Sequence, residues 1–360
     1  MNFDFNDEQR AIKDAAHDML AKRYPVEEVR RLGLEDERGF TDEQWRELAE
    51  LGWPGIFVAE EDGGQGLGVV ELVILQEELG YALAPTPFFS NACAGLLLAA
   101  AGTAEQREAH LRPLAAGEQR GTVALWDEGQ GRVPTDIGLE PTGSSLTGTK
   151  IAVPDAGSAD FVVVAASAGR HFLVETDAGG VEIEPAPGLD PTRKLFTVHL
   201  DGVEAHQLDH DVDATDRAYW AMCTALAAES TGVAQRALDM AVEYAKDRKQ
   251  FERPIGSYQA VSHRCAQMLL EVEGARSVTY YAAWALDHEP ESAALAASMA
   301  KAYASDAGWR VTASALQVHG GIGFTWEHDL HFFLKRARAN AAALGDPRWH
   351  RERVADLAGV

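Results

Sequence analysis

The sequence has few cysteines and few basic residues for a chain of 360 residues. Its three cysteines, Cys93, Cys223 and Cys265, lie far apart and form no CxxC pair, so neither a zinc site nor a disulfide framework is indicated. Lys and Arg number 32 against 56 acidic residues, which gives a formal net charge of -24. Such an acidic chain disfavours nucleic acid and anionic membranes as partners, because both recruit Lys and Arg.

Long hydrophobic runs are also absent. The longest uncharged apolar stretch, near residues 92–102, is too short to span a bilayer. The N-terminal stretch MNFDFNDEQR is acidic and unlike a signal or transit peptide. We therefore expect a cytoplasmic protein that binds neither membrane nor nucleic acid, and in which any site for a phosphate-bearing ligand is locally basic.

What is present changes twice along the chain. Residues 1–117 have a helical pattern in which Asn6, Thr41 and Thr103 each precede a Gln by three residues, as in a capping box, and a further helix is expected over 69–82. Residues 118–210 carry short apolar or alternating runs between Gly and Pro clusters, which predict strands at 122–126, 161–165, 171–174 and 196–200.

From residue 211 the helical pattern returns and lasts to the end. Two apolar helix faces stand out, Leu238, Ala241, Val242 and Ala245 on one helix and Val261, Cys265, Met268, Leu269 and Val272 on the next. The alanine content of these stripes favours closely packed helices. The sequence therefore predicts an α+β protein with an N-terminal helical domain (1–117), a middle β-domain (118–210) and a C-terminal helical bundle (211–360).

Three local motifs are more specific than this order of elements. They are GWPG at 52–55 with EEDGGQGLG at 60–68, RKQFERPIG at 248–256 followed by YQ at 258–259, and QVHGGIGFT at 317–325. In this order and spacing the chain resembles the acyl-CoA dehydrogenases over its whole length. The resemblance implies a middle β-barrel or sandwich, a C-terminal four-helix bundle, FAD as cofactor, and α,β-dehydrogenation of an acyl-CoA thioester with transfer of electrons to an acceptor.

The matched residues have a physical reason to contact FAD. The Arg248 guanidinium can bind a diphosphate through two parallel hydrogen bonds, and in the family the matching Arg reaches the FAD of a neighbouring subunit. Gly320 and Gly321 let backbone N–H groups approach a phosphate closely, with Gln317 one turn before. The resemblance adds Gln250, Phe251 and Tyr258, whose rings could pack on adenosine.

Each of these residues also has a plainer interpretation. Arg248 could be a solvated residue of the charged turn 246–249, the glycines could form an ordinary helix C-cap, and the two aromatic residues could belong to the core. The basic residues Lys335, Arg336, Arg338, Arg348, Arg351 and Arg353 are expected to form a solvated helix face rather than a phosphate site. His319, His328 and His331 lack metal-ligand spacing and are expected to have packing or surface roles.

The chain departs from the family where the catalytic base and the subunit's own flavin would be held. Leu344 stands where the family has its usual catalytic Glu, and Met222 stands at the alternative position for the base; neither side chain can accept a proton. The two flavin-holding stretches are replaced by Trp126-Asp127-Glu128 and Ala152-Val153-Pro154, and Asp346 replaces an adenosine-side Thr.

Own-flavin contacts are thus lost while cross-subunit contacts are kept. This predicts a non-catalytic subunit that shares FAD with a second acyl-CoA dehydrogenase-like chain in an α2β2 assembly, as in heteromeric bacterial steroid-CoA dehydrogenases. Two alternatives stay open: a self-sufficient dehydrogenase with a relocated base, for which Glu229 is a better candidate than Asp346, and a flavin-free scaffold. For Glu229, packing at the bundle interface or pairing with a basic residue is the simpler interpretation.

Overall fold

The computed structural model describes residues 5–360, which form two compact units. The bundle unit contains Val73–Ala84, Cys223–Val360 and the described residues up to Arg31, and the β unit contains Leu32–Leu72 and Pro85–Met222. Residues 1–4, part of the acidic N-terminal stretch considered above, lie outside the described residues. No helix among residues 5–360 is long and apolar enough to cross a membrane.

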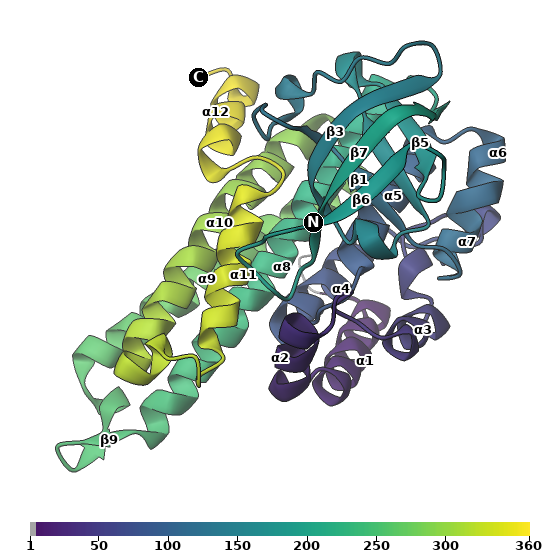
Figure 1. Ribbon diagram of the computed structural model, residues 1–360. Coiled ribbons are helices and arrows are strands. Elements are labelled where there is room, and N and C mark those ends of the chain that lie inside the picture. Colours follow the sequence, from purple (N-terminus) through teal and green to yellow (C-terminus); the bar gives the residue numbers. More distant parts are fainter. Residues whose placement is uncertain (1–4) are drawn as a thin grey trace. The chain divides into compact units, whose positions relative to one another are not determined.

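The order of elements along the chain is helical, then strands, then helical, as the sequence predicts. The domain boundaries 1–117, 118–210 and 211–360 stay a prediction. The helices that lie wholly or mainly in the bundle unit (Figure 1) are α1 (Asp7–Arg23), α2 (Val26–Glu35), α4 (Val69–Ala82), α8 (Val212–Asp247), α9 (Gln259–His288), α10 (Pro290–His319), α11 (Leu330–Ala342) and α12 (Pro347–Ala358).

Alanine lets the long helices α8, α9 and α10 pack closely. One part of their interface consists of buried alanines, namely Ala227, Ala275, Ala282, Ala285, Ala296, Ala300, Ala304 and Ala307. In another part the predicted face residues Leu238, Ala241, Met268 and Val272 are buried. Leu269 was expected on that face but is 48% exposed, because it follows Met268 directly and so lies about 100° further round the helix.

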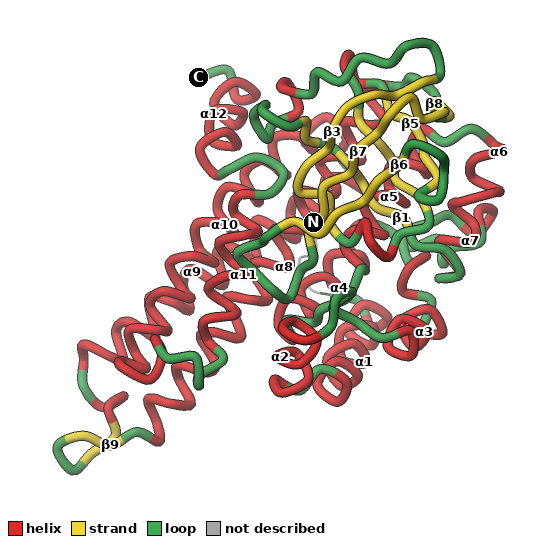
Figure 2. The backbone as a smooth tube through the Cα atoms, in the orientation of Figure 1, coloured by secondary structure: helices red, strands yellow, loops and turns green. Residues whose placement is uncertain are grey.

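The β unit combines short helices with two four-stranded sheets, drawn in yellow in Figure 2. Its helices are α3 (Asp42–Glu50), α5 (Phe88–Ala101), α6 (Ala104–Gln106) and α7 (Arg112–Ala115). Its strands are β1 (Gly121–Ala124), β2 (Trp126–Asp127), β3 (Ser145–Pro154), β4 (Phe161–Ala165), β5 (His171–Glu175), β6 (Val181–Ala186), β7 (Leu195–Glu204) and β8 (His206–Gln207).

The four strands predicted from the sequence are all present, as β1, β4, β5 and β7. One sheet has the order β1-β4-β5-β8 with β1 parallel to β4, and the other has the antiparallel order β2-β3-β7-β6. Residues from both sheets share one core, which is why β7 alternates between buried and less buried positions from Leu195 to Leu200. A middle β-domain of two packed sheets follows.

The three predicted capping boxes are confirmed. The side chains of Asn6, Thr41 and Thr103 each accept a hydrogen bond from the backbone N–H of the Gln three residues later, and each Gln side chain bonds back. These local signals set the first residues of α1, α3 and α6. The helix predicted over 69–82 is observed as α4.

Candidate functional site: the edge of the bundle

The motif segment 248–259 forms a small hairpin at one end of the bundle unit. Helix α8 ends at Asp247, Arg248 follows it, and β9 (Lys249–Gln250) pairs antiparallel with β10 (Arg253–Pro254). The turn between them places Phe251 and Glu252 at φ of 51° and 68°. Two adjacent residues with positive φ suit the right-handed twist of a two-residue hairpin, and this turn leaves the Phe251 side chain 88% exposed.

Tyr258 closes this hairpin from the side of α9. Its hydroxyl donates to the Gln250 carbonyl oxygen at 3.2 Å, and its ring lies 4.0 Å from the Arg253 guanidinium. The rings of Phe251 and Tyr258 meet edge to face at 6.4 Å. Tyr258 therefore supports the hairpin, which places Phe251 at its exposed tip. Arg253, whose guanidinium lies over the Tyr258 ring, belongs to the same group and was missed by the sequence analysis.

The motif segment 317–325 contains the end of α10 and the turn that follows it. Gly320 has φ 63° and ψ -139°, a backbone conformation that side chains rarely adopt, and its N–H closes the helix onto the Leu316 and Gln317 carbonyl oxygens. Gly321 has no positive φ, and a Cβ added there would meet nothing within 4 Å. The chain itself thus requires glycine at Gly320 but not at Gly321, as expected where an outside group approaches the backbone.

The two segments lie at the same end of the bundle. Ile255 packs against the apolar cluster that contains Leu316 and Val318, and the Ile255 N–H donates to the Arg248 carbonyl oxygen at 2.8 Å. One turn before Arg248, the Tyr244 ring stacks on His319 with centroids 4.5 Å apart. We call residues 248–258 and 317–326 together the bundle edge; the hairpin β9–β10 marks its tip in Figure 1.

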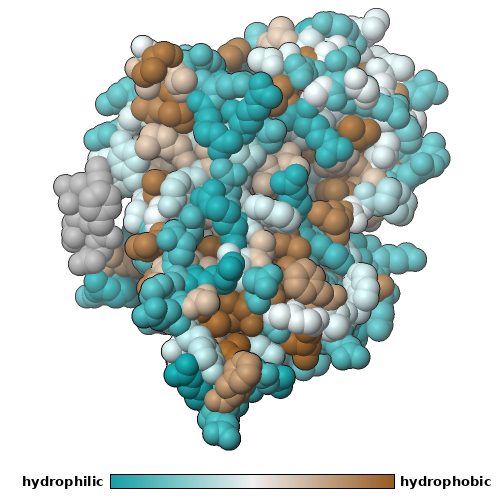
Figure 3. All heavy atoms as spheres, turned by 90° about the vertical axis from the view of Figure 1, so that its left-hand side faces the viewer, coloured by the Kyte–Doolittle hydropathy of each residue, from teal (hydrophilic) through white to brown (hydrophobic). Residues whose placement is uncertain are grey.

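Exposed apolar side chains gather on the bundle edge. Besides Phe251, Ile322 is 43% exposed, Phe324 69% and Trp326 66%. Figure 3 faces the side on which the hairpin lies and shows hydrophobic residues among hydrophilic ones toward the hairpin end. Exposed aromatic residues around a motif are typical of a contact surface rather than of a solvated turn.

Glu229, the candidate for a relocated base, is buried in the bundle and ion-paired. One carboxylate oxygen contacts the Arg336 guanidinium, and the other accepts from the Asn340 side-chain amide at 3.2 Å. Helix α4 covers the same place, since a Cβ on Gly80 would lie 2.2 Å from the Glu229 carbonyl oxygen. The Glu229 carboxylate is therefore buried and engaged by side chains of α11.

Arg336 was expected on a solvated basic face, and this is wrong. Its side chain is buried, because it faces Glu229 from α11 at the helix interface. The other five residues of the basic group are spread over separate contacts: Arg348 with Glu352, Arg351 with Asp306, Arg353 with Asp356, Arg338 over Trp309 and Lys335 over Trp326. They form no joint phosphate site.

The loop that follows α11 holds Leu344 at the position of the family's usual base. Leu344 is buried with φ 55°, and its carbonyl oxygen accepts from the His350 imidazole at 2.8 Å and from the Cys223 thiol at 3.8 Å. Asp346 accepts from the Trp349 N–H at 2.8 Å and so caps α12. The loop is held by contacts within the chain, and its one carboxylate is engaged at the first turn of α12.

Lys301 was not identified from the sequence and is the main support of this loop. Its ammonium is fully buried and donates to the carbonyl oxygens of Asn340 and Gly345 and to the Ser305 hydroxyl, at 3.0–3.1 Å. Burial lowers the pKa of Lys301 from 10.5 to about 8. A cation placed at the last carbonyls of α11 is favoured by the helix dipole.

In the β unit, the segments matched to the family's flavin-holding stretches make contacts within the chain. Asp127 contacts the Lys150 ammonium at 2.6 Å, and its second oxygen accepts from the N–H groups of Gly138 and Leu139. Lys150 is wholly buried, and burial lowers its pKa despite the Asp127 carboxylate. Ala152, at φ 54°, sits in the irregularity of β3 between Lys150 and Val153.

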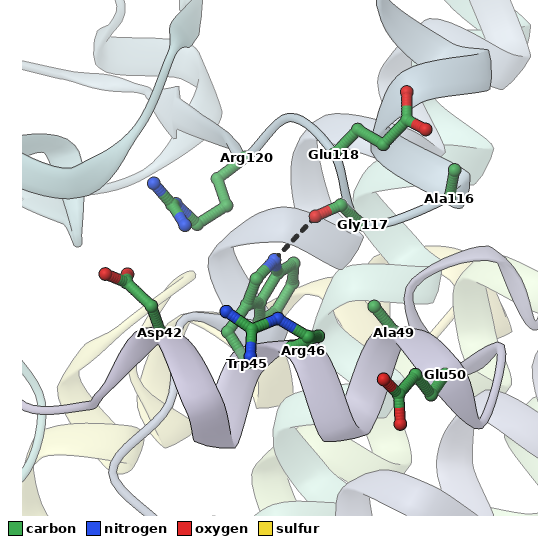
Figure 4. A pocket seen from close by; sticks show the side chains of 9 residues that line it. All are labelled: Asp42, Trp45, Arg46, Ala49, Glu50, Ala116, Gly117, Glu118 and Arg120. Carbon is green, nitrogen blue, oxygen red and sulfur yellow. Dashed lines mark hydrogen bonds between the residues drawn. The ribbon is translucent and has the colours of Figure 1, made fainter.

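Two further cavities contain none of the motif residues. In the β unit, an open groove of about 650 Å³ lies between α3 and the loop before β1, with Trp45 at its floor donating to the Gly117 carbonyl oxygen at 2.8 Å (Figure 4). Both acidic and basic side chains line this groove, including Glu50 and Arg46. In the bundle unit, a cavity of about 210 Å³ lies among α1, α4, α8 and α11 beside Tyr81 and Arg236.

Comparison with known proteins agrees with this architecture. Residues 6–118 match the model of the acyl-CoA dehydrogenase N-terminal domain, and residues 222–358 match that of the acyl-CoA dehydrogenase C-terminal domain. Acyl-CoA dehydrogenase IpdE2 of Mycolicibacterium smegmatis is 33% identical over 342 residues, covering 95% of this chain and 96% of that protein.

Two solved structures are similar over nearly the whole chain. A structure titled as the Tcur3481-Tcur3483 steroid ACAD G363A variant has a TM-score of 0.90 and 32% identity and covers 98% of both chains. The ChsE4-ChsE5 complex from Mycobacterium tuberculosis has a TM-score of 0.90 and 28% identity and covers 100% of this chain and 99% of that one. With both terminal domain models matched and a relative 33% identical along the chain, this protein belongs to the acyl-CoA dehydrogenase family.

Proposed function

We propose that this chain is the non-catalytic subunit of a heteromeric FAD-dependent acyl-CoA dehydrogenase, and that its bundle edge contacts FAD held by a catalytic partner subunit. The carrying observation is the contrast between two places. Leu344 is buried and cannot act as a base, and the one carboxylate of its loop, Asp346, caps α12, whereas the bundle edge with Arg248 and Gly321 is exposed.

The residues of the bundle edge suit a dinucleotide. Arg248 supplies a guanidinium for the diphosphate, Gln317 and the N–H groups of Gly320 and Gly321 supply polar contacts, and the exposed Phe251 ring, supported by Tyr258 and Gln250, supplies a surface for adenosine. FAD, when bound, accepts the hydride that leaves the β-carbon of the acyl-CoA thioester. The proton at the α-carbon is removed by a base of the partner, since Glu229, Leu344 and Met222 cannot do so here.

Contacts within the β unit support the division of roles. At the first of the two stretches, the Asp127 carboxylate is ion-paired with Lys150 of the same chain. At the second, the Pro154 carbonyl oxygen accepts from the Thr122 hydroxyl at 2.5 Å. Pro154 also lacks a backbone N–H that a flavin could accept from. This subunit would therefore hold no FAD of its own.

A steroid side-chain CoA is the proposed substrate class, and an α2β2 assembly with an electron-transfer acceptor is the proposed context. Support comes from similarity to a steroid dehydrogenase and to a two-protein complex. The alternative of a self-sufficient enzyme based on Glu229 is not favoured, because Arg336 and Asn340 occupy its carboxylate.

The test is the flavin absorbance of the chain purified alone and after co-expression with a candidate acyl-CoA dehydrogenase-like partner chain. We expect bound FAD and turnover of an acyl-CoA only in the co-expressed preparation. Stoichiometric FAD and activity in the single chain would refute the proposal. An active co-purified assembly whose FAD content is unchanged by Arg248→Ala would refute the role of the bundle edge.

A further inference from the structure

Three aromatic rings join the ends of three helices at the bundle edge. Tyr244 from the last turn of α8 stacks on His319 at the end of α10, with centroids 4.5 Å apart and ring planes 24° apart. His328, which lies just before α11, packs edge to face against the same His319 ring, with centroids 4.5 Å apart. The Gly320–Gly321 turn follows His319 directly, and Arg248 lies one turn after Tyr244. The stack therefore holds in place both segments of the bundle edge, 248–258 and 317–326.

Hydrogen bonds determine the protonation of the two imidazoles. His319 Nδ1 lies 2.8 Å from the Ala315 carbonyl oxygen and must carry a proton to donate to it. His328 Nδ1 accepts from the Leu330 N–H at 3.2 Å and so must be unprotonated. Because Leu330 is the first residue of α11, His328 acts as a cap at that helix N-terminus, and a neutral imidazole is required there.

A proton on His328 would act against the stack in three ways. It would occupy the nitrogen that accepts from Leu330, place a cation at the positive end of the α11 dipole, and weaken the contact with His319. Burial already lowers the pKa of both His319 and His328 from the ordinary 6.5, and for His328 the Asp329 carboxylate opposes this shift. Neutral rings are therefore the favoured state.

The other charged groups around the stack do not cancel this effect. Asp329 is engaged by the Arg30 guanidinium from α2, at 2.5 and 3.1 Å. Lys335 on α11 lies over Trp326 and adds positive charge beside His331, whose pKa burial and Lys335 both lower. The α8 residue in the stack is Tyr244. Besides Asp329, the segment between α10 and α11 contains one other acidic residue, Glu327.

We propose that Tyr244, His319 and His328 are positioning residues for the bundle edge, and that His328 makes its contact with FAD dependent on pH by releasing the 320–329 segment when it is protonated. This inference rests on the proposed function. The ligand concerned is the diphosphate-bearing cofactor of the partner subunit.

The test compares two substitutions at one position in the assembled enzyme. In His328→Asn the side-chain oxygen can still accept from Leu330 but cannot titrate. Loss of the ring contact with His319 should lower FAD retention on gel filtration slightly at every pH, and retention should no longer fall between pH 6.5 and pH 5. In His328→Lys a permanent cation without an acceptor should lower FAD retention about tenfold at every pH. His263→Asn, an exposed histidine on α9, is the matched control and should keep the wild-type profile.

A second readout separates this inference from the proposed function. Amide hydrogen exchange of residues 320–330, corrected for intrinsic rates, should lose protection on acidification in wild type but not in His328→Asn. Identical exchange profiles in the two proteins would overturn the inference. If Arg248→Ala releases FAD and His328→Lys does not, the stack does not position the edge and only the inference fails. If both variants keep FAD, the proposed function fails.

Discussion

In the proposed function, Arg248 is the residue on which the contact with FAD depends most directly. It follows the last residue of α8 and is exposed, so truncation should leave the fold intact. A charge-assisted contact to phosphate contributes roughly 1.5–3 kcal/mol, so Arg248→Ala should weaken FAD binding by about one to two orders of magnitude. Flavin content after dialysis of the assembled enzyme measures this. Lys246→Ala, an exposed cation one half-turn earlier, should have no effect; equal flavin loss in both variants would indicate a general charge effect.

Lys301 makes stability depend on pH in a window of its own. Its pKa is about 8 in the folded chain against 10.5 ordinarily, so between these values the unfolded chain binds a proton that the folded chain lacks. Stability attributable to this residue therefore rises with pH from about 8 to 10.5 and is lower below pH 8, where the buried ammonium is charged.

The variant Lys301→Met lacks this titration. The difference in melting temperature between wild type and Lys301→Met should change in favour of wild type as the pH is raised from 7.5 to 10. Differential scanning calorimetry at matched ionic strength measures it, and the other titrating groups are shared by both proteins. A difference that stays constant with pH would mean that the Lys301 ammonium does not lose its proton in the fold.

Between elements, the Glu229–Arg336 pair joins α8 to α11. Removing one partner leaves an unpaired buried charge, so Glu229→Gln should lower the free energy of unfolding by about 3–5 kcal/mol. Single-turnover flavin reduction by the folded, assembled variant should stay close to wild type, because general-base catalysis contributes typically about 10²–10⁴-fold and this carboxylate does not supply it. Glu229→Gln combined with Arg336→Met should recover part of the stability. Loss of several hundredfold in reduction rate at full FAD occupancy would instead make Glu229 the base.

The turn after α10 contains one glycine that the fold needs and one that the fold does not need. Gly320 has φ 63°, so Gly320→Ala should destabilise the chain by about 1 kcal/mol or more. Gly321 has neither positive φ nor a close neighbour, so Gly321→Ala should leave the melting temperature within about 1 °C of wild type yet reduce FAD retention. The two measurements are thermal unfolding of the chain and flavin content of the assembly. A Gly321→Ala assembly with full FAD would show that nothing approaches this backbone.

At the scale of the whole molecule, the proposed division of roles would halve the cofactor content. In that proposal the buried Lys150–Asp127 pair and the missing base belong to a flavin site that this chain has lost, while the bundle edge serves the FAD of the partner. We expect one FAD for every two chains in the assembled enzyme, measured by flavin absorbance against protein mass. One FAD per chain would mean that the β unit binds flavin despite the Lys150–Asp127 ion pair.

Features set by residues close in sequence could be predicted well. The capping boxes at Asn6, Thr41 and Thr103 depend on contacts within a few residues, and helix α4 and the four strands each follow from the residue pattern of one short segment. The motifs likewise predicted the fold class and the family, because the spacing of Arg248 and Gly320 along the chain is itself the signal. The absence of a base at Leu344 is also visible in the sequence alone.

Features that join distant residues were decided by tertiary packing. Arg336 was predicted to be solvated because its neighbours in sequence are basic, yet Glu229, 107 positions away, lies across the helix interface from it. Lys150 and Lys301 carry no local signal, since a lysine within an apolar pattern looks the same whether its ammonium reaches water or buried acceptors. Whether a charged side chain is buried depends on which helix or strand faces it, and local periodicity does not contain that information.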